Sequence, residues 1–381
     1  MIYFDNAASG GFKPDSVYQA TTSVLKNLLT NASRSGHSLS VLAENLVFDT
    51  RKKLSKHLNN GHIDRLIFTP SCTLALNYAI LGSLNFSDEV ITTVTEHNSV
   101  LRPLYHLEKT KNVHIKYAQL NKQGFVDLSK IFELITNKTK AIIMNAVSNV
   151  TGLENQFEQV GEKLKTENLK GKIKFIVDGA QAGGHKRFDM ISCGIDALCL
   201  AGHKGLYAYQ GVGVLALSDQ LDIKPILFGG TGSETFDKYT LTMPDCFEVG
   251  TQNLPAIASL CYGIDYAYKN LEYTKNRLLH LTEKLIIALS QIKNIKLYSK
   301  PNNYGIVSFA INGMESTQVA EILNKEYQIA VRGGFHCAPL IHKALKTADN
   351  GLIRASLSNY NTENEIKIFT DAITKIALNL L

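Results

Sequence analysis

The sequence predicts an α/β protein, with a mainly parallel sheet covered by helices and a smaller α+β domain after it. The first observation is that short apolar or β-branched runs alternate with helical patterns across residues 65–217. The second is a stretch at 221–253 that is rich in Gly, Thr, Pro and acidic residues. The third is the change beyond it, where a long helical pair at 255–292 leads into mixed strands and helices.

The strands expected in the first part are short and apolar, and they cover residues 66–68, 90–94, 141–144, 175–177, 197–200 and 212–215. Between them lie apolar residues at helical spacing, as at Leu128, Ile131 and Ile135. Strands that alternate with helices form parallel sheets, whose ligands bind beyond the carboxyl ends of the strands. The residues that directly follow these runs are therefore the candidates for a site.

The second part of the chain has a different order of elements. Strand-like runs cover 295–298, 305–311, 328–332 and 352–356, and helices are expected at 317–326 and from 362 onward. We expect a large domain of residues 15–253, and a small domain made of residues 1–14 together with 254–381.

Composition narrows the class of protein. The 381 residues carry a net charge of only +6, spread along the chain, so we expect no nucleic acid partner. The sequence shows no leader pattern and no apolar run long enough to span a bilayer, which favours a cytoplasmic protein with no membrane contact. The six cysteines form no CxxC pair, and four of them are expected to be buried apolar residues: Cys193, Cys199, Cys246 and Cys261.

The strongest local signal is a pair of polar residues at the ends of two neighbouring strands. Asp178 ends the run 175–177, and the next strand is followed by Gly202-His203-Lys204. Taken alone, Asp178 is best explained as a residue that opens a turn, and Lys204 as a solvated loop lysine. Together they offer a carboxylate for a pyridinium nitrogen and an amine for a Schiff base, which is what pyridoxal 5'-phosphate (PLP) requires.

A phosphate group needs backbone N–H donors at the start of a helix. Residues 69–73 lie between a strand and a helix that begins near Thr73, and His203 arrives from a neighbouring strand. Without other signals, such a polar turn is an ordinary helix cap.

Cys337 stands in a setting that differs from that of the other cysteines. A strand at 328–332 is followed by Gly333 and Gly334, and Pro339 marks the start of a helix. A cysteine at that position, beside His336 and near Arg332, is expected to favour its thiolate form.

Two further residues follow or lie on predicted strands. His97 directly follows 90–94, and an unperturbed histidine pKa of about 6.5 suits proton transfer. Arg354 lies in the strand-like run 351–356 and offers the planar fork that binds a carboxylate in a bidentate manner.

From Tyr3-Phe4-Asp5-Asn6 to about residue 362, the chain resembles the class V aminotransferase family of fold-type I PLP enzymes. Within that family it is similar to the cysteine desulfurase and selenocysteine lyase group, and the segment around Cys337 is similar to the active-site loop of group II enzymes. The resemblance implies a large domain with a seven-stranded type of sheet and a Schiff base on Lys204. The other contacts it implies are, to the cofactor ring, Asp178, Gln181, Asn149 and His97; to the phosphate, His203, Cys72 and Thr73; and to the substrate, Arg354 and Asn149.

These signals lead to a predicted reaction, in which L-cysteine becomes L-alanine and its sulfur passes to Cys337 as a persulfide. L-selenocysteine is a second candidate substrate, and a sulfur-acceptor protein is an expected partner. Residues 228–233 resemble the family segment that reaches the cofactor phosphate of a partner subunit, so we expect a homodimer in which Thr231 acts across the interface.

Several alternatives stay open at this stage. A selenocysteine lyase, a cysteine lyase without persulfide transfer and a transaminase use the same scaffold, although a transaminase needs no thiol. A zinc hydrolase with histidine, Cys337 and Asp178 ligands finds no HExxH or CxxC spacing, so no metal is expected. A dinucleotide-binding oxidoreductase lacks its GxGxxG, and a catalytically inactive binding protein would have little use for Lys204, Asp178, Cys337 and Arg354 together.

Overall fold

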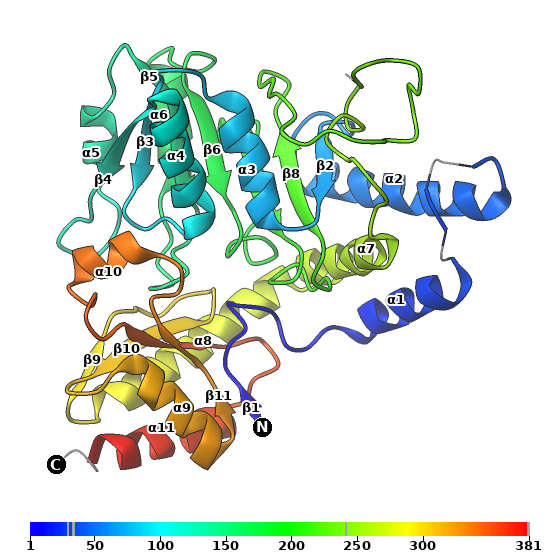
Figure 1. The fold of residues 1–381 in the computed structure, drawn as a ribbon. Coiled ribbons are helices and arrows are strands. Elements are labelled where there is room, and N and C mark those ends of the chain that lie inside the picture. Colours follow the sequence, from blue (N-terminus) through cyan, green and yellow to red (C-terminus); the bar gives the residue numbers. More distant parts are fainter. Residues whose placement is uncertain (29, 33–34, 241, 379–381) are drawn as a thin grey trace.

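The computed structural model describes residues 1–28, 30–32, 35–240 and 242–378. Figure 1 shows a large sheet flanked by helices, with a smaller group of strands and helices beneath it. The first residues of the chain and the last described ones, up to residue 378, lie in the smaller group. The expected α/β class with a second, smaller α+β part is confirmed.

The large sheet has seven strands in the order β2-β8-β7-β6-β5-β3-β4. Their bounds are β2 (Leu66–Thr69), β3 (Glu89–Thr93), β4 (His114–Ala118), β5 (Thr139–Asn145), β6 (Lys174–Asp178), β7 (Ala197–Ala201) and β8 (Gly213–Leu217). The sheet is mainly parallel, because only β8 runs antiparallel to its neighbours β2 and β7. Strand β4 was not predicted, since this edge strand buries only Ala118 and reads as polar.

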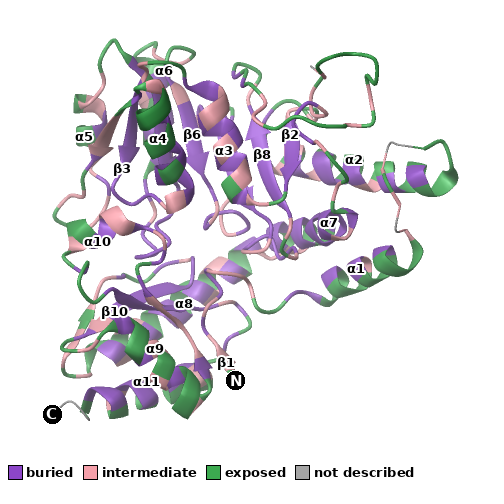
Figure 2. Ribbon diagram, viewed as in Figure 1, coloured by how far each residue is buried: buried purple, intermediate pink, exposed green. Residues whose placement is uncertain are grey.

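Helices cover both faces of this sheet, as Figure 2 shows by the buried strands between half-exposed helices. They are α2 (Ser38–Leu58), α3 (Cys72–Ser83), α4 (Asn98–Lys111), α5 (Leu128–Glu133), α6 (Phe157–Thr166) and α7 (Leu254–Lys269), while α1 (Asp15–Asn27) packs against α7. In β5, Ala141 and Ile143 join one apolar core while Ile142 and Met144 join the other. This alternation places the strand between two helical layers.

The smaller part is built on an antiparallel sheet in the order β12-β13-β10-β9. Its strands and helices are α8 (Leu271–Ser290), β9 (Ile295–Leu297), β10 (Ile306–Ile311), α9 (Ser316–Tyr327), β12 (Arg332–Gly334), α10 (Pro339–Leu345), β13 (Leu352–Ser356) and α11 (Glu363–Leu378). The amino terminus joins this part, because β1 (Ile2–Tyr3) pairs with β11 (Ile329–Ala330). None of the helices in the described ranges is long and apolar enough to cross a membrane.

The domain division near residue 253 stays a proposal. Helix α7 contributes Leu254, Ile257 and Leu260 to the core of the large sheet, whereas α8 contributes Leu278 and Leu281 to the core of the small one. The two helices are consecutive, so they join the two cores directly.

Gly184 allows a close approach that the site depends on. Its φ is +83°, and an added Cβ would collide with the backbone of Gly205, the residue that follows Lys204. Gly171 has the same φ of +83°, but an added Cβ there would meet nothing within 4 Å.

We predict that Gly184→Ala destabilises the protein far more than Gly171→Ala. The control substitution adds only the left-handed backbone penalty of about 1–2 kcal/mol. Gly184→Ala adds the same penalty and a steric overlap worth about 1–3 kcal/mol more. Urea unfolding of both variants measures the difference, and equal losses of unfolding free energy would contradict this account.

Candidate active site

A cavity of about 220 Å³ lies at the carboxyl ends of β3, β5, β6 and β7, and two arginines on strands of the four-stranded sheet complete its wall. Each parallel strand delivers polar residues just after its last residue, as expected for this type of sheet. The predicted site residues in the wall are Cys72, Thr73, His97, Asn149, Asp178, Gln181, His203, Lys204 and Arg354. Cys337 and Thr231 are not part of this wall.

Asp178 is the last residue of β6, and its side chain is buried, with 5% exposure. Its Oδ1 accepts a hydrogen bond from the backbone N–H of Ala180 at 2.9 Å, and the Cys72 sulfur lies 3.9 Å from the same oxygen. Burial raises the pKa of the carboxyl group, while Ala180, Lys204 and Cys72 oppose that shift. A buried carboxylate with so few donors suits a protonated ring nitrogen as its partner.

The Cys72 thiol is directed at Asp178. Burial, followed by the charge of Asp178, raises the pKa of Cys72 well above its usual range, so the thiol stays neutral. Because the sulfur faces the Asp178 carboxylate, the predicted phosphate contact of Cys72 would have to come from its backbone N–H.

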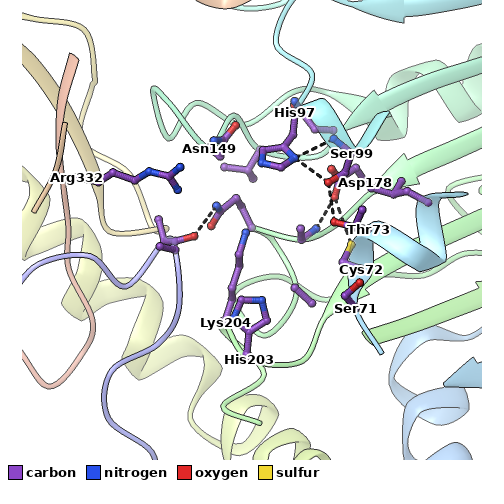
Figure 3. A pocket seen from close by; sticks show the side chains of 18 of the residues that line it. Ser71, Cys72, Thr73, His97, Ser99, Asn149, Asp178, His203, Lys204 and Arg332 are labelled. Carbon is purple, nitrogen blue, oxygen red and sulfur yellow. Dashed lines mark hydrogen bonds between the residues drawn. The ribbon is translucent and has the colours of Figure 1, made fainter. Parts of the chain in front are cut away.

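Lys204 follows β7 and reaches into the cavity beside His203 (Figure 3). Burial is the main cause that lowers the pKa of its amine, and the charge of Asp178 partly opposes it. A desolvated lysine of lowered pKa is the form that attacks carbonyl groups and accepts protons.

His97 caps the amino terminus of α4, with its Nδ1 accepting from the backbone N–H of Ser99 at 3.0 Å. This bond assigns the ring proton to Nε2. Burial, then the charges of Lys204 and Arg332, lowers the pKa of His97 to about 4. The ordinary pKa expected from sequence is therefore wrong, because the site surrounds a buried ring with cations, and His97 is neutral at pH 7.

The loop between β2 and α3 leads into the start of a helix, where the sequence predicts the phosphate contacts. Ser71 caps α3 by accepting from the backbone N–H of Leu74 at 3.2 Å, and the first-turn N–H groups of a helix have no partner within it. Gly213 of β8 lies so close that an added Cβ would collide with the backbone of Ser71 and Cys72. Burial lowers the pKa of His203 to about 4, so its neutral ring still offers one N–H to an anion.

Arg354 lies on β13 and is 1% exposed. Its Nη2 donates to Asp5 Oδ1 at 3.0 Å and its Nη1 to the carbonyl oxygen of Asn149 at 3.0 Å. Its buried Nε has no hydrogen-bond partner. The guanidinium therefore keeps N–H groups for a further anion, while Asp5 fixes its orientation.

Cys337 contacts a residue of the cavity wall and lies in a turn held from both sides. Arg332, which lines the cavity, donates from Nη2 to the Cys337 sulfur at 3.5 Å. The Cys337 carbonyl accepts from the backbone N–H of Asn98 at 2.6 Å, and Asn149 Nδ2 donates to the His336 carbonyl at 2.8 Å. His336 and Cys337 both have left-handed backbones, with φ of 51° and 56°, a conformation that side chains seldom adopt.

The cause expected to favour the Cys337 thiolate is partly wrong. His336 is buried, and burial followed by the charge of Arg354 lowers its pKa to about 2, so it supplies no positive charge. Helix α10, which begins at Pro339, is only seven residues long. The cation beside the sulfur is Arg332, which adjoins it through the fold of the turn.

Thr231 lies on the loop 227–240 and contacts Ser233, with 3.2 Å between their hydroxyl oxygens. It lines two other cavities and takes no part in the wall of this one. Its predicted role across a subunit interface stays a prediction.

Three features of the site could not be predicted from sequence, although Arg332 was already named as a neighbour of Cys337. Asp5 orients Arg354, Arg332 lines the cavity, and the Ser99 hydroxyl bonds both His97 and Thr73, at 2.8 Å in each case. Asp5 stands in the opening motif that carries the family resemblance, which was its one signal. As for the zinc alternative, no three or more His, Cys, Asp or Glu side chains gather to hold a metal ion in the part of the chain that the structure describes.

Residues 2–369 match the model of the family described as aminotransferase class-V. The chain belongs to this family. A "Probable cysteine desulfurase" from Methanothermobacter thermautotrophicus is 31% identical over 99% of this chain and 94% of its own length. A "Cysteine desulfurase" from Wigglesworthia glossinidia brevipalpis is 30% identical over 99% and 92%.

Solved structures of class V aminotransferase relatives share the fold. The apo structure of a cysteine desulfurase from Thermococcus onnurineus NA1 has a TM-score of 0.89, with 28% identity over 99% of this chain and 95% of its own. The cysteine desulfurase CsdA from Escherichia coli, in an S-sulfonic acid form, has a TM-score of 0.87, with 25% identity over 100% and 95%. The similarity therefore extends over nearly the whole chain.

We predict that Asp5→Ala destabilises the protein, because it leaves Arg354 buried without its carboxylate. An unsatisfied buried donor costs about 1–3 kcal/mol, and more when it is charged. Asp222→Ala is the matched control, because it breaks a pair with Arg65 in which Asp222 is 88% exposed. Exposed pairs contribute only about 0–1 kcal/mol. Urea unfolding tests this ranking, and a larger loss for Asp222→Ala would contradict it.

Proposed function

We propose that this chain is a PLP-dependent cysteine desulfurase, which converts L-cysteine to L-alanine and takes the sulfur onto Cys337. The observation that carries the proposal is one cavity that holds Asp178 and Lys204 together, with the Cys337 sulfur joined to its wall through Arg332. Relatives named as cysteine desulfurases that align over nearly the whole chain support it.

The donor set of the cavity fits the cofactor. Lys204 would hold it covalently through Nζ, and the buried carboxylate of Asp178 would pair with the ring nitrogen. The start of α3 and the neutral His203 ring match a phosphate, and His97 and Gln181 line the space between them. When bound, PLP supplies an electron sink for the carbon next to the substrate amine.

Lys204 then moves the proton that starts the reaction. Its amine has a lowered pKa because of burial, so its Nζ is suited to take the proton from the substrate α-carbon. Asp178 would pair with the ring nitrogen and favour its protonated form, which would give the buried carboxylate a partner. His97 is neutral, and its Nδ1 accepts from the backbone N–H of Ser99, so its proposed part is to orient the cofactor and to exclude water.

Arg354 is proposed to hold the substrate carboxylate. Its guanidinium is fixed by Asp5 and by the carbonyl oxygen of Asn149, and it retains N–H groups directed at the cavity wall. A rigid, buried guanidinium binds a carboxylate with geometric specificity. This contact would set the substrate sulfur toward Arg332 and Cys337.

The sulfur step is a displacement at sulfur. The thiolate of Cys337 attacks the substrate sulfur, and a new S–S bond forms. The bond between that sulfur and the β-carbon breaks, and the carbon keeps the electron pair. This carbon then takes up a proton and becomes the methyl group of alanine, while the persulfide stays on Cys337.

We propose that the persulfide passes to an acceptor protein and that the enzyme is cytoplasmic. The six cysteines are free thiols, the form that cysteine takes in reducing compartments. L-selenocysteine would occupy the same site, because Arg354 and Lys204 recognise groups that both amino acids share.

We also propose a homodimer. Helices α1 and α2 and the loop 227–240 project on one side of the molecule (Figure 1) and carry exposed apolar side chains, namely Leu25, Leu42, Phe48, Phe228 and Phe236. Exposed apolar side chains that gather on one side of a molecule are typical of an interface. Thr231, which lies on the same loop, would then reach the phosphate site of the partner.

We predict that Phe48→Glu weakens the dimer and also weakens cofactor binding, because each site needs the loop of the other subunit. Phe86→Glu is the control, since Phe86 is 72% exposed on the loop after α3. Sedimentation equilibrium and PLP titration check both effects. A wild-type monomer that binds PLP with full affinity would exclude the interface.

We predict that Cys337→Ser binds PLP and L-cysteine but produces no alanine, because the serine hydroxyl does not attack sulfur. Cys193→Ser is the control, since Cys193 is half-buried against the core of the large sheet and not, as expected from sequence, fully buried; it does not line the cavity, so the variant should keep full activity. Mass spectrometry after one turnover should show one added sulfur on Cys337 of the wild type. Unmodified Cys337 with pyruvate and ammonia as products would instead identify a cysteine lyase.

A further inference from the structure

Glu96 is a buried carboxylic acid that the mechanism above does not use. It lies between β3 and His97, and its side chain is 0% exposed. Its Oε1 accepts from the Thr93 hydroxyl at 2.6 Å and from the backbone N–H of Asn145 at 3.0 Å. Its Oε2 is buried without a hydrogen-bond partner.

The surroundings of Glu96 do not stabilise a negative charge on its carboxyl group. No ion pair to Glu96 occurs within the described ranges, and the charged group that faces it is Asp178, which pairs in register with Asn145 on the next strand. A buried carboxylate with one bare oxygen and an anion nearby is strongly unfavourable. Burial first, then the charge of Asp178, raises the pKa of Glu96 to about 8.

The hydrogen bonds of Glu96 belong to a buried network between the ends of β3 and β5. The Thr95 hydroxyl bonds Thr93 at 2.7 Å, and Asn145 Nδ2 donates to the Thr95 carbonyl at 2.6 Å. Asn155 Nδ2 donates to Asn145 Oδ1 at 2.6 Å. The network fixes the turn that presents His97 and adjoins the start of the loop that carries Asn149.

We propose that Glu96 is a positioning residue that acts through His97. It is an uncharged acid that fixes the turn from which the His97 ring extends, and it leaves Asp178 as the anion of the cavity. In the described part of the chain, Asp178 is the one acidic residue that lines this cavity. A second ionised carboxylate nearby would compete with it for the same positive charges. The inference rests on the proposed function, which gives the cavity its cofactor.

The first test uses the protein without PLP and compares wild type with Glu96→Gln. Because the folded-state pKa of Glu96 is raised, the folded protein holds a proton that the unfolded chain loses above about pH 4.5. The contribution of Glu96 to the stability of the wild-type protein therefore falls as the pH rises from 5 to 8. Glutamine does not titrate, so Glu96→Gln does not lose stability in this way. The thermal midpoint of Glu96→Gln should therefore rise relative to that of the wild type as the pH rises from 5 to 8.

Glu89→Gln is the matched control at the other end of β3. Glu89 is also buried, but it pairs with Lys116 at 2.7 Å and accepts from the Thr139 hydroxyl at 2.5 Å. These partners lower the pKa of Glu89 despite its burial, so the substitution should destabilise the protein at pH 8. A midpoint for Glu96→Gln that tracks wild type at every pH, or falls like that of Glu89→Gln, would overturn the uncharged acid.

The second test measures how the turn holds His97, by NMR titration of the histidines in the same protein. Glu96→Gln should keep the His97 pKa near 4. Glu96→Ala removes the acceptor for Thr93 and Asn145, so the His97 pKa should move toward the ordinary value of about 6.5. Equal His97 titrations in both variants, or a shift in Glu96→Gln, would overturn the positioning role.

The thermal midpoints and the histidine titration are both measured on the protein without PLP, and neither requires enzyme activity. A protein that binds no PLP would refute the proposed function, whereas both readouts for Glu96 would still give a result. Where Glu96→Ala does not fold, Glu96→Leu replaces it, because leucine fills the space and also lacks the acceptor oxygen.

Discussion

The pairing of β6 with β7 in parallel is the constraint on which the site depends. Asp178 ends β6 in register with Cys199 of β7, and Lys204 follows the end of that strand. The sheet therefore holds a carboxylate and an amine at fixed positions on one edge. In the proposed function, this pair would fix the position of the cofactor, and the start of α3, His97 and the arginines would surround it.

Charge organises the cavity around that pair. Lys204, Arg332 and Arg354 face it, whereas Asp178 is its acidic lining residue within the described ranges. Burial and these cations keep His97 and His203 neutral at pH 7. A cavity with this excess of positive charge suits a phosphate and an amino acid carboxylate together, which is the combination that the proposed reaction brings there.

Much of the fold and many of the site residues could be predicted because they follow from local pattern. Apolar runs gave six strands of the large sheet, and the polar residues after them included Asp178, Lys204 and His97. Long-range contacts could not be predicted. Asp5 meets Arg354 across most of the chain length, and the pKa of His97 depends on cations from other elements. The direction of β8 was also hidden, because burial on both faces looks the same in either orientation.

The proposed function depends most directly on Lys204, and chemical trapping of the bound cofactor tests the role of this residue in one measurement. The protein saturated with PLP is reduced with borohydride, digested and mapped by mass spectrometry. We expect one pyridoxyl adduct, on Lys204, and its loss in Lys204→Ala. An adduct on another residue of the wild type, or no adduct after saturation, would contradict the proposal that Lys204 and Asp178 hold the cofactor.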